Sequence, residues 1–74
     1  MTVKEAVAYV RDNYPKSDAR WELTDWLHKL ASGNMRRLYG ECFGWHKDLP
    51  KDIDAATELT AENEAELKRR MAAL

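Results

Sequence analysis

The sequence has few residues that cross-link or bend a chain: its 74 residues include one cysteine, two prolines and three glycines. Because Cys42 is the only cysteine, a disulfide within the chain is excluded, and a single thiol fits a reducing compartment better than an oxidising one. Three glycines are also too few for a glycine-rich loop that cradles phosphate groups. A domain this small and without a disulfide therefore depends on its apolar core for stability.

The sequence also lacks a long hydrophobic run. No segment approaches the roughly 18 consecutive apolar residues that a membrane-spanning helix needs. The first ten residues contain Lys4 and Glu5 and no continuous apolar stretch, which is unlike a secretory signal peptide. Charged residues make up 34% of the chain. These features predict a soluble, cytoplasmic protein without a membrane partner.

Neither sign of charge dominates, since the formal net charge is −1. That balance argues against a dedicated nucleic-acid-binding protein. The charges are unevenly placed, however: residues 28–47 carry four cationic side chains and one carboxylate, whereas residues 48–66 carry seven carboxylates and one lysine. Such a bipolar chain either compensates its charges internally or presents faces of opposite sign to a partner.

Two helices are predicted in the first half of the chain. Thr2 and Glu5 have the spacing of a capping box, and apolar residues at helical intervals follow until Pro15, which predicts a helix over residues 3–13. A second helix is expected to begin at Ser17 or Asp18 and to end at Gly33, because glycine is favoured just after a helix.

The second half is predicted to contain two more helices and a loop. Asn34 is expected to cap a third helix over residues 35–43. Residues 45–59 are expected to form a loop with at most one short helical turn near Pro50, anchored by Leu49 and Ile53. Thr60 then begins the last helix, in which Glu64 and Glu66 precede Lys68 and Arg70 by four residues each and so predict two ion pairs.

Together these patterns predict an all-α domain spanning residues 1–74. It is expected to be a small bundle of about four helices, with a three-helix core and a more peripheral C-terminal helix, because the apolar stripe of that last helix is narrow. The side chains expected to be most buried are Val7, Val10, Leu23, Trp26, Leu27, Leu30, Leu38 and Phe43.

No group of residues predicts catalysis or metal binding. Cys42 and His46 lie four residues apart, but a zinc site usually has three or four protein ligands, and His28 is the only other imidazole. Cys42, His46 and Asp48 are nominally a thiol, an imidazole and a carboxylate, yet so short a chain leaves little room for a substrate cleft and an oxyanion hole. We therefore predict a protein that is not an enzyme and has no cofactor or metal.

A helix-turn-helix DNA-binding regulator is one interpretation of residues 23–43. Two predicted helices flank the short turn at residues 32–34, and Arg36 and Arg37 lie at the start of the second helix, where a recognition helix contacts bases. Lys29 and Lys47 could contact phosphates. Against this interpretation, His28 and Ser32 occupy positions that are usually buried, and Glu41 can pair with Arg37.

The aromatic residues favour a protein-interaction module instead, namely a small adaptor, regulator or inhibitor that occupies a partner's surface. Trp21 falls on the helix face opposite the apolar stripe, unless it covers the edge of the core, and Trp45 follows a predicted helix end. A homo-oligomer through the narrow apolar stripe of Leu67, Met71 and Leu74 is a natural extension. The predicted partner-binding residues are Trp21, Arg36, Arg37, Trp45, His46 and Lys47.

Overall fold

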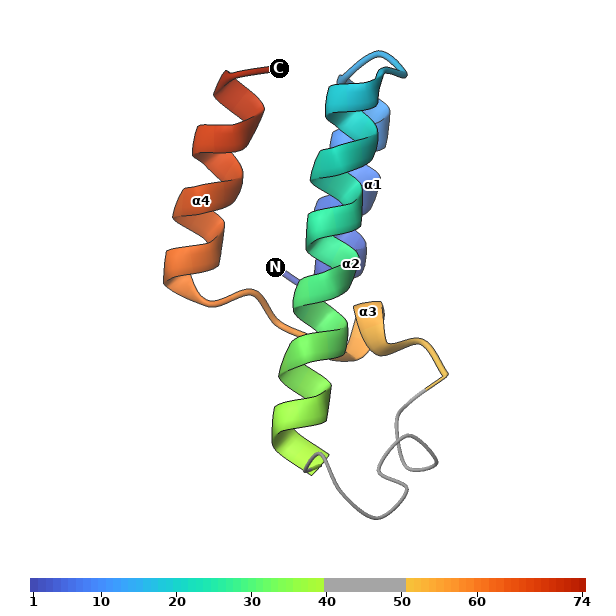
Figure 1. The fold of residues 1–74 in the computed structure, drawn as a ribbon, viewed down its shortest axis with the longest axis vertical. Coiled ribbons are helices and arrows are strands. Elements are labelled where there is room, and N and C mark those ends of the chain that lie inside the picture. Colours follow the sequence, from blue (N-terminus) through green and yellow to red (C-terminus); the bar gives the residue numbers. More distant parts are fainter. Residues whose placement is uncertain (40–50) are drawn as a thin grey trace.

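The structure, a computed structural model, describes residues 1–39 and 51–74, and over residues 34–39 it describes the backbone alone. This part of the chain forms four helices: α1 (Val3–Asn13), α2 (Asp18–Tyr39), α3 (Ile53–Ala56) and α4 (Ala61–Ala72). Within these ranges the one β-type pairing is an isolated antiparallel bridge between Thr2 and Glu58. The predicted all-α bundle of four helices is confirmed (Figure 1).

Helix α1 begins and ends where the sequence predicts. The Thr2 hydroxyl accepts a hydrogen bond from the Glu5 backbone N–H at 3.1 Å, and the Glu5 carboxylate accepts one from the Thr2 N–H at 2.9 Å. This capping box satisfies two backbone donors that a helix start leaves unpaired. At the other end Tyr14 is extended, as expected for a residue before proline. The helix buries one face, formed by Val3, Ala6, Val7 and Val10.

Helix α2 corrects one prediction. It begins at Asp18 as expected but runs without interruption to Tyr39, so Gly33 lies inside the helix and Asn34 does not cap a new one. A glycine in a helix interior costs only about 1 kcal/mol relative to alanine, which the rest of a 22-residue helix outweighs. The predicted separate helix over 35–43 is therefore wrong up to Tyr39, and residues 40–43 lie outside the described residues. The turn that a helix-turn-helix needs at residues 32–34 is not formed.

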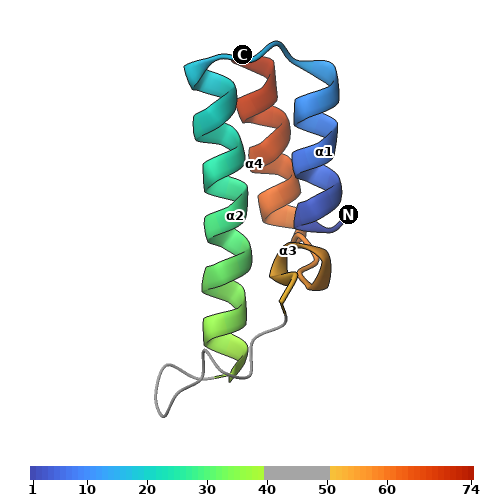
Figure 2. The same cartoon turned by 90° about the vertical axis from the view of Figure 1, so that its right-hand side faces the viewer.

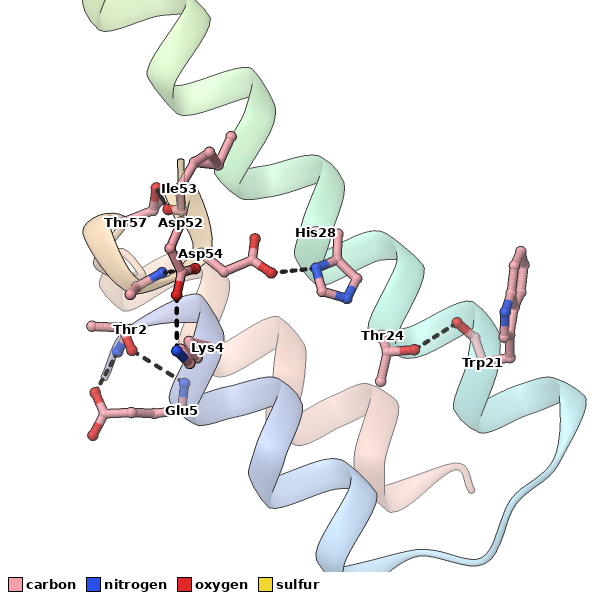
Figure 3. Close-up of polar contacts among 11 residues, drawn as sticks. Thr2, Lys4, Glu5, Trp21, Thr24, His28, Asp52, Ile53, Asp54 and Thr57 are labelled. Atoms are coloured by element: carbon pink, nitrogen blue, oxygen red, sulfur yellow. Dashed lines mark hydrogen bonds and ion pairs between the residues drawn. The ribbon is translucent and has the colours of Figure 1, made fainter. Parts of the chain in front are cut away.

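The segment that contains α3 is held between the start of α1 and the middle of α2 (Figures 1 and 3). Lys4 of α1 lies 2.8 Å from Asp52, and His28 Nδ1 of α2 lies 2.5 Å from an Asp54 carboxylate oxygen. The Val3 N–H donates to the Thr57 carbonyl at 2.9 Å. Ile53 packs against the core, which confirms its predicted role as an anchor, whereas Leu49 lies outside the described residues.

The core lies between α1, α2 and α4, which run side by side in Figure 2. Val7, Val10, Leu23 and Leu27 are buried as predicted. Trp26 and Leu30 are only partly buried, and the side chains of Leu38 and Phe43 are not among those described. Helical periodicity alone could not predict which parts of the stripe a neighbour covers. The buried core also contains Val3, Ala6, Ala31, Leu59 and Leu67.

Helix α4 has fewer buried residues than α1, but it joins α1 and α2 in the core in place of the separate helix predicted over residues 35–43. It begins after Thr60, whose hydroxyl accepts from the Asn63 N–H at 3.1 Å, and Leu67 is its one buried residue. Of the two predicted ion pairs, Glu66 to Arg70 is formed at 3.0 Å. Glu64 instead lies 3.5 Å from the amino group of Met1, so its predicted pair with Lys68 is not formed.

The sequence predicts that the apolar stripe of Leu67, Met71 and Leu74 packs against a second copy of the chain. In the structure, most of this stripe packs within its own chain. Leu67 is 3% exposed in the core, and Met71 is partly buried against it. Of the three stripe residues, only Leu74 is exposed, at 41%. The stripe therefore gives no reason to expect a homo-oligomer. Among the described helices, none is long and apolar enough to cross a membrane.

Candidate docking site

Trp21 lies in the first turn of α2, on the side of the helix that the core does not cover. The turn is set by Ser17, whose hydroxyl accepts from the Arg20 N–H at 3.1 Å and whose carbonyl accepts from the Trp21 N–H at 2.9 Å. Leu23 and Leu27 point into the core from the same helix. The Trp21 side chain is 66% exposed, and its indole projects away from α2 in Figure 3. The sequence left two positions open for Trp21, outward or over the edge of the core, and the structure shows the outward one.

A hollow of about 400 Å³ adjoins this indole at the turn between α1 and α2. We call it the Trp21 hollow. It draws residues from the last turns of α1, from the connecting turn and from the start of α2, and none from α4. Its lining residues are Arg11, Lys16, Ser17, Asp18, Arg20, Trp21 and Thr24.

Arg20 holds the two helix ends of the hollow together. Its guanidinium donates to the Tyr14 carbonyl at 3.1 Å and to the Arg11 carbonyl at 3.4 Å. Both carbonyls belong to the C-terminal end of α1, where the helix leaves its acceptors unpaired and where a cation is favoured. Arg20 therefore has a structural role, and it keeps the cationic residues of α1 and of the turn beside Trp21.

Arg11 and Lys16 are the hollow's other cations, and both are exposed. Neither makes an ion pair with any residue in the ranges 1–33 and 51–74, whose side chains are described. By contrast, Lys4 and Lys29 lie within 2.9 Å of carboxylate oxygens on Asp52 and Asp25. The Trp21 hollow thus places an exposed indole beside two cations that no described side chain pairs.

The hollow continues along the face that α1 and α2 share. A second hollow of about 240 Å³ shares Arg11, Trp21 and Thr24 with the first and extends to His28. Thr24 is 8% exposed, its hydroxyl donates to the Trp21 carbonyl at 3.0 Å, and it lies between Trp21 and His28 on α2 (Figure 3). The two hollows form one groove that begins at Trp21.

Of the six predicted partner-binding residues, the structure places one at this groove. Arg36 and Arg37 lie in the last part of α2, far along the helix from Trp21, and their side chains are not described. Trp45, His46 and Lys47 lie outside the described residues. Sequence reasoning missed Arg11 and Lys16. The signal was available: helices joined by a short turn are antiparallel neighbours, so the end of one meets the start of the next.

The candidate metal ligands are not gathered by the described part of the chain. His28 bonds Asp54 through Nδ1, and no group of three potential ligands lies within metal-binding reach among the described residues. Cys42 and His46, the other residues considered for zinc, lie outside those residues.

Comparison with known proteins gives no relative. No protein-family model, curated protein or solved structure matches the chain. The exposed Trp21 and its surroundings are therefore the features of the chain that point to a function.

Proposed function

We propose that the chain is a non-enzymatic protein-interaction module, an adaptor, regulator or inhibitor that acts by docking Trp21 onto another protein. The supporting observation is that Trp21 is 66% exposed beside the Trp21 hollow, whereas Leu23 and Leu27 of the same helix are buried in the core. A tryptophan carries one of the largest apolar surfaces of any side chain, and burying it stabilises an interface by several kcal/mol. Because most of the Trp21 side chain is exposed, little of this apolar surface stabilises the folded chain.

The residue types around Trp21 are those that dominate protein interfaces. Tryptophan and arginine are enriched among the few residues that carry most of the binding energy, and a polar or charged rim that excludes water normally surrounds them. Here Arg11 and Lys16 provide such a rim. Because Arg20 and Ser17 fix the first turn of α2, the indole is presented from a rigid element, which reduces the entropy lost on binding.

The experiment compares Trp21→Ala with Tyr9→Ala in affinity capture from a lysate of the producing cells. Tyr9 is a matched control because it is an exposed aromatic, at 48%, in the groove between α1 and α4. The proposal expects a protein that is captured by the wild type and by Tyr9→Ala but not by Trp21→Ala. With that protein purified, the dissociation constant should rise at least about 30-fold for Trp21→Ala, the effect of losing a hot-spot residue.

Trp21→Ala should leave the fold intact, because alanine has the highest helix propensity and the core does not contain Trp21. Circular dichroism and thermal unfolding check this. Equal capture by all three proteins would refute the proposal, as would unfolding of Trp21→Ala, which would make Trp21 a core residue.

A further inference from the structure

The charges at the Trp21 hollow are unbalanced in one direction. Three cationic side chains line it, Arg11, Lys16 and Arg20, against the single carboxylate of Asp18. Arg20 donates its hydrogen bonds to backbone carbonyls of α1, which leaves Arg11 and Lys16 to contact a ligand. The whole chain has a formal net charge of −1, so this excess of two positive charges is not a general property of the chain.

The groove from Trp21 to His28 has room for a short extended peptide. Seven residues separate these two positions on α2, and a helix rises about 1.5 Å per residue, so the groove is roughly 10 Å long. An extended chain covers that length with about three residues. Alternate side chains of such a peptide point in opposite directions, so one side chain can lie on the indole while its neighbours reach the rim.

We propose that the groove beginning at the Trp21 hollow binds an acidic segment of a partner protein. In this arrangement an apolar side chain of the segment packs on Trp21, and adjacent carboxylates pair with Arg11 and Lys16. The inference rests on the proposed function and gives the partner a chemical class. Charge complementarity supports it, because two carboxylates of the segment can pair with Arg11 and Lys16, two exposed cations that have no ion-pair partner among the described side chains.

A protein segment fits this groove better than a nucleic acid or a membrane surface. Asp18 lines the Trp21 hollow, and Asp25 lines its continuation, so fixed carboxylates lie within the groove. A polyphosphate backbone or a sheet of anionic headgroups would meet these carboxylates unavoidably, whereas a peptide can place neutral side chains opposite them. Two available cations would also release too few counterions for strong nucleic-acid binding.

The test is selection of binding peptides from a random displayed library on the immobilised full-length chain. The expected peptides carry aspartate or glutamate beside a large apolar residue. For a synthetic selected peptide, the double variant Arg11→Glu with Lys16→Glu should raise the dissociation constant at least about tenfold. The matched control is Lys51→Glu with Lys68→Glu, which makes the same change in net charge at exposed sites outside the groove. This control should change the dissociation constant less than about twofold.

Each outcome decides between the two proposals. Two results would overturn this inference and leave the docking function standing. In one, the selected peptides depend on Trp21 but are neutral or basic. In the other, acidic peptides bind the Arg11→Glu, Lys16→Glu variant as tightly as they bind the wild type. Absence of any peptide that Trp21→Ala weakens would overturn both. Tighter Trp21-dependent binding to phosphatidylserine vesicles or to a short single-stranded oligonucleotide than to the selected peptides would replace the acidic protein segment with that ligand.

Discussion

Two tryptophans five residues apart in α2 have different environments. Trp26 is partly buried against the core, and the guanidinium of Arg70 in α4 lies 4.4 Å from the centroid of its ring. Trp21 is 66% exposed. Because a helix turns about 100° per residue, Trp21 falls opposite the apolar stripe that contains Trp26. Helical spacing leaves open whether another helix covers Trp21, and its exposure shows that none of the described helices does.

Arg20 shows what a residue-by-residue pattern misses. Its contacts reach the Tyr14 and Arg11 carbonyls, which only the tertiary arrangement of α1 and α2 brings near. We predict that Arg20→Met lowers the free energy of unfolding by about 1 kcal/mol, because the methionine keeps the apolar stem but leaves these carbonyls without their donor. Urea unfolding at neutral pH measures the change.

Lys16→Met is the control for this prediction, since Lys16 is an exposed cation in the same turn. It should change stability by less than about 0.5 kcal/mol. If Arg20→Met and Lys16→Met had the same free energy of unfolding, the hydrogen bonds of Arg20 would not stabilise the turn. Another interaction would then have to hold Trp21 in place.

Among the helices, the sequence predicts the bounds well where a clear capping residue is present. It does not predict the C-terminal end of α2, which contains Gly33 in its interior. The side chains of Thr2 and Thr60 mark the starts of α1 and α4, and each accepts the hydrogen bond expected of a helix cap. The sequence predicts a helix end at Gly33, because glycine is common just after a helix. A glycine ends a helix only where the chain turns away, and sequence alone does not show whether it does.

Substitution of Gly33 separates the continuous helix from the predicted turn. Gly33 is exposed in α2, and a Cβ added to it would meet no atom within 4 Å. Gly33→Ala should therefore raise the free energy of unfolding by about 0.5–1 kcal/mol, because alanine lowers the entropy of the unfolded chain and favours a helix. Thermal and urea unfolding measure the gain.

Gly33→Asn is the matched variant for this position. In a helix, asparagine should be less stabilising than alanine, whereas in a left-handed turn the order reverses, since asparagine tolerates that conformation and alanine does not. A destabilised Gly33→Ala together with a neutral Gly33→Asn would contradict the continuous α2.

At the scale of the whole molecule, the ends of the chain are tied together by contacts that no local pattern predicts. Lys4 pairs with Asp52 across 48 positions, and the Leu59 N–H donates to the Met1 carbonyl at 2.9 Å. Helical periodicity predicts which apolar side chains of α1 and α2 face the core. It does not predict that Leu59 and Leu67 complete that core. The helix content followed from sequence, whereas the arrangement of the helices depends on these distant pairs.

These ion pairs predict how the stability of the molecule responds to acid. Hydrogen bonds from Lys4 and from the Ala55 N–H lower the pKa of Asp52, and hydrogen bonds from the backbone and hydroxyl of Thr2 lower the pKa of Glu5. The Arg70 guanidinium lowers the pKa of Glu66. A carboxyl whose pKa is lower in the folded than in the unfolded chain stabilises the fold above its unfolded pKa and loses that contribution as the pH falls through its folded pKa.

The free energy of unfolding should therefore be nearly constant from about pH 5 to neutrality and fall below about pH 4.5. Urea titrations at a series of pH values measure it. Asp52→Asn should flatten part of the acid decline, because asparagine still caps α3 but cannot form the ion pair with Lys4. The control is Glu62→Gln, which removes an exposed carboxylate that has no described ion pair. It should leave the dependence of stability on pH unchanged. Glu5 and Asp52 are exposed and the Glu66 side chain is 32% exposed, so about 1 M NaCl should also shrink the decline. A profile that falls equally in Asp52→Asn and in the wild type would show that the pair between Lys4 and Asp52 does not stabilise the fold.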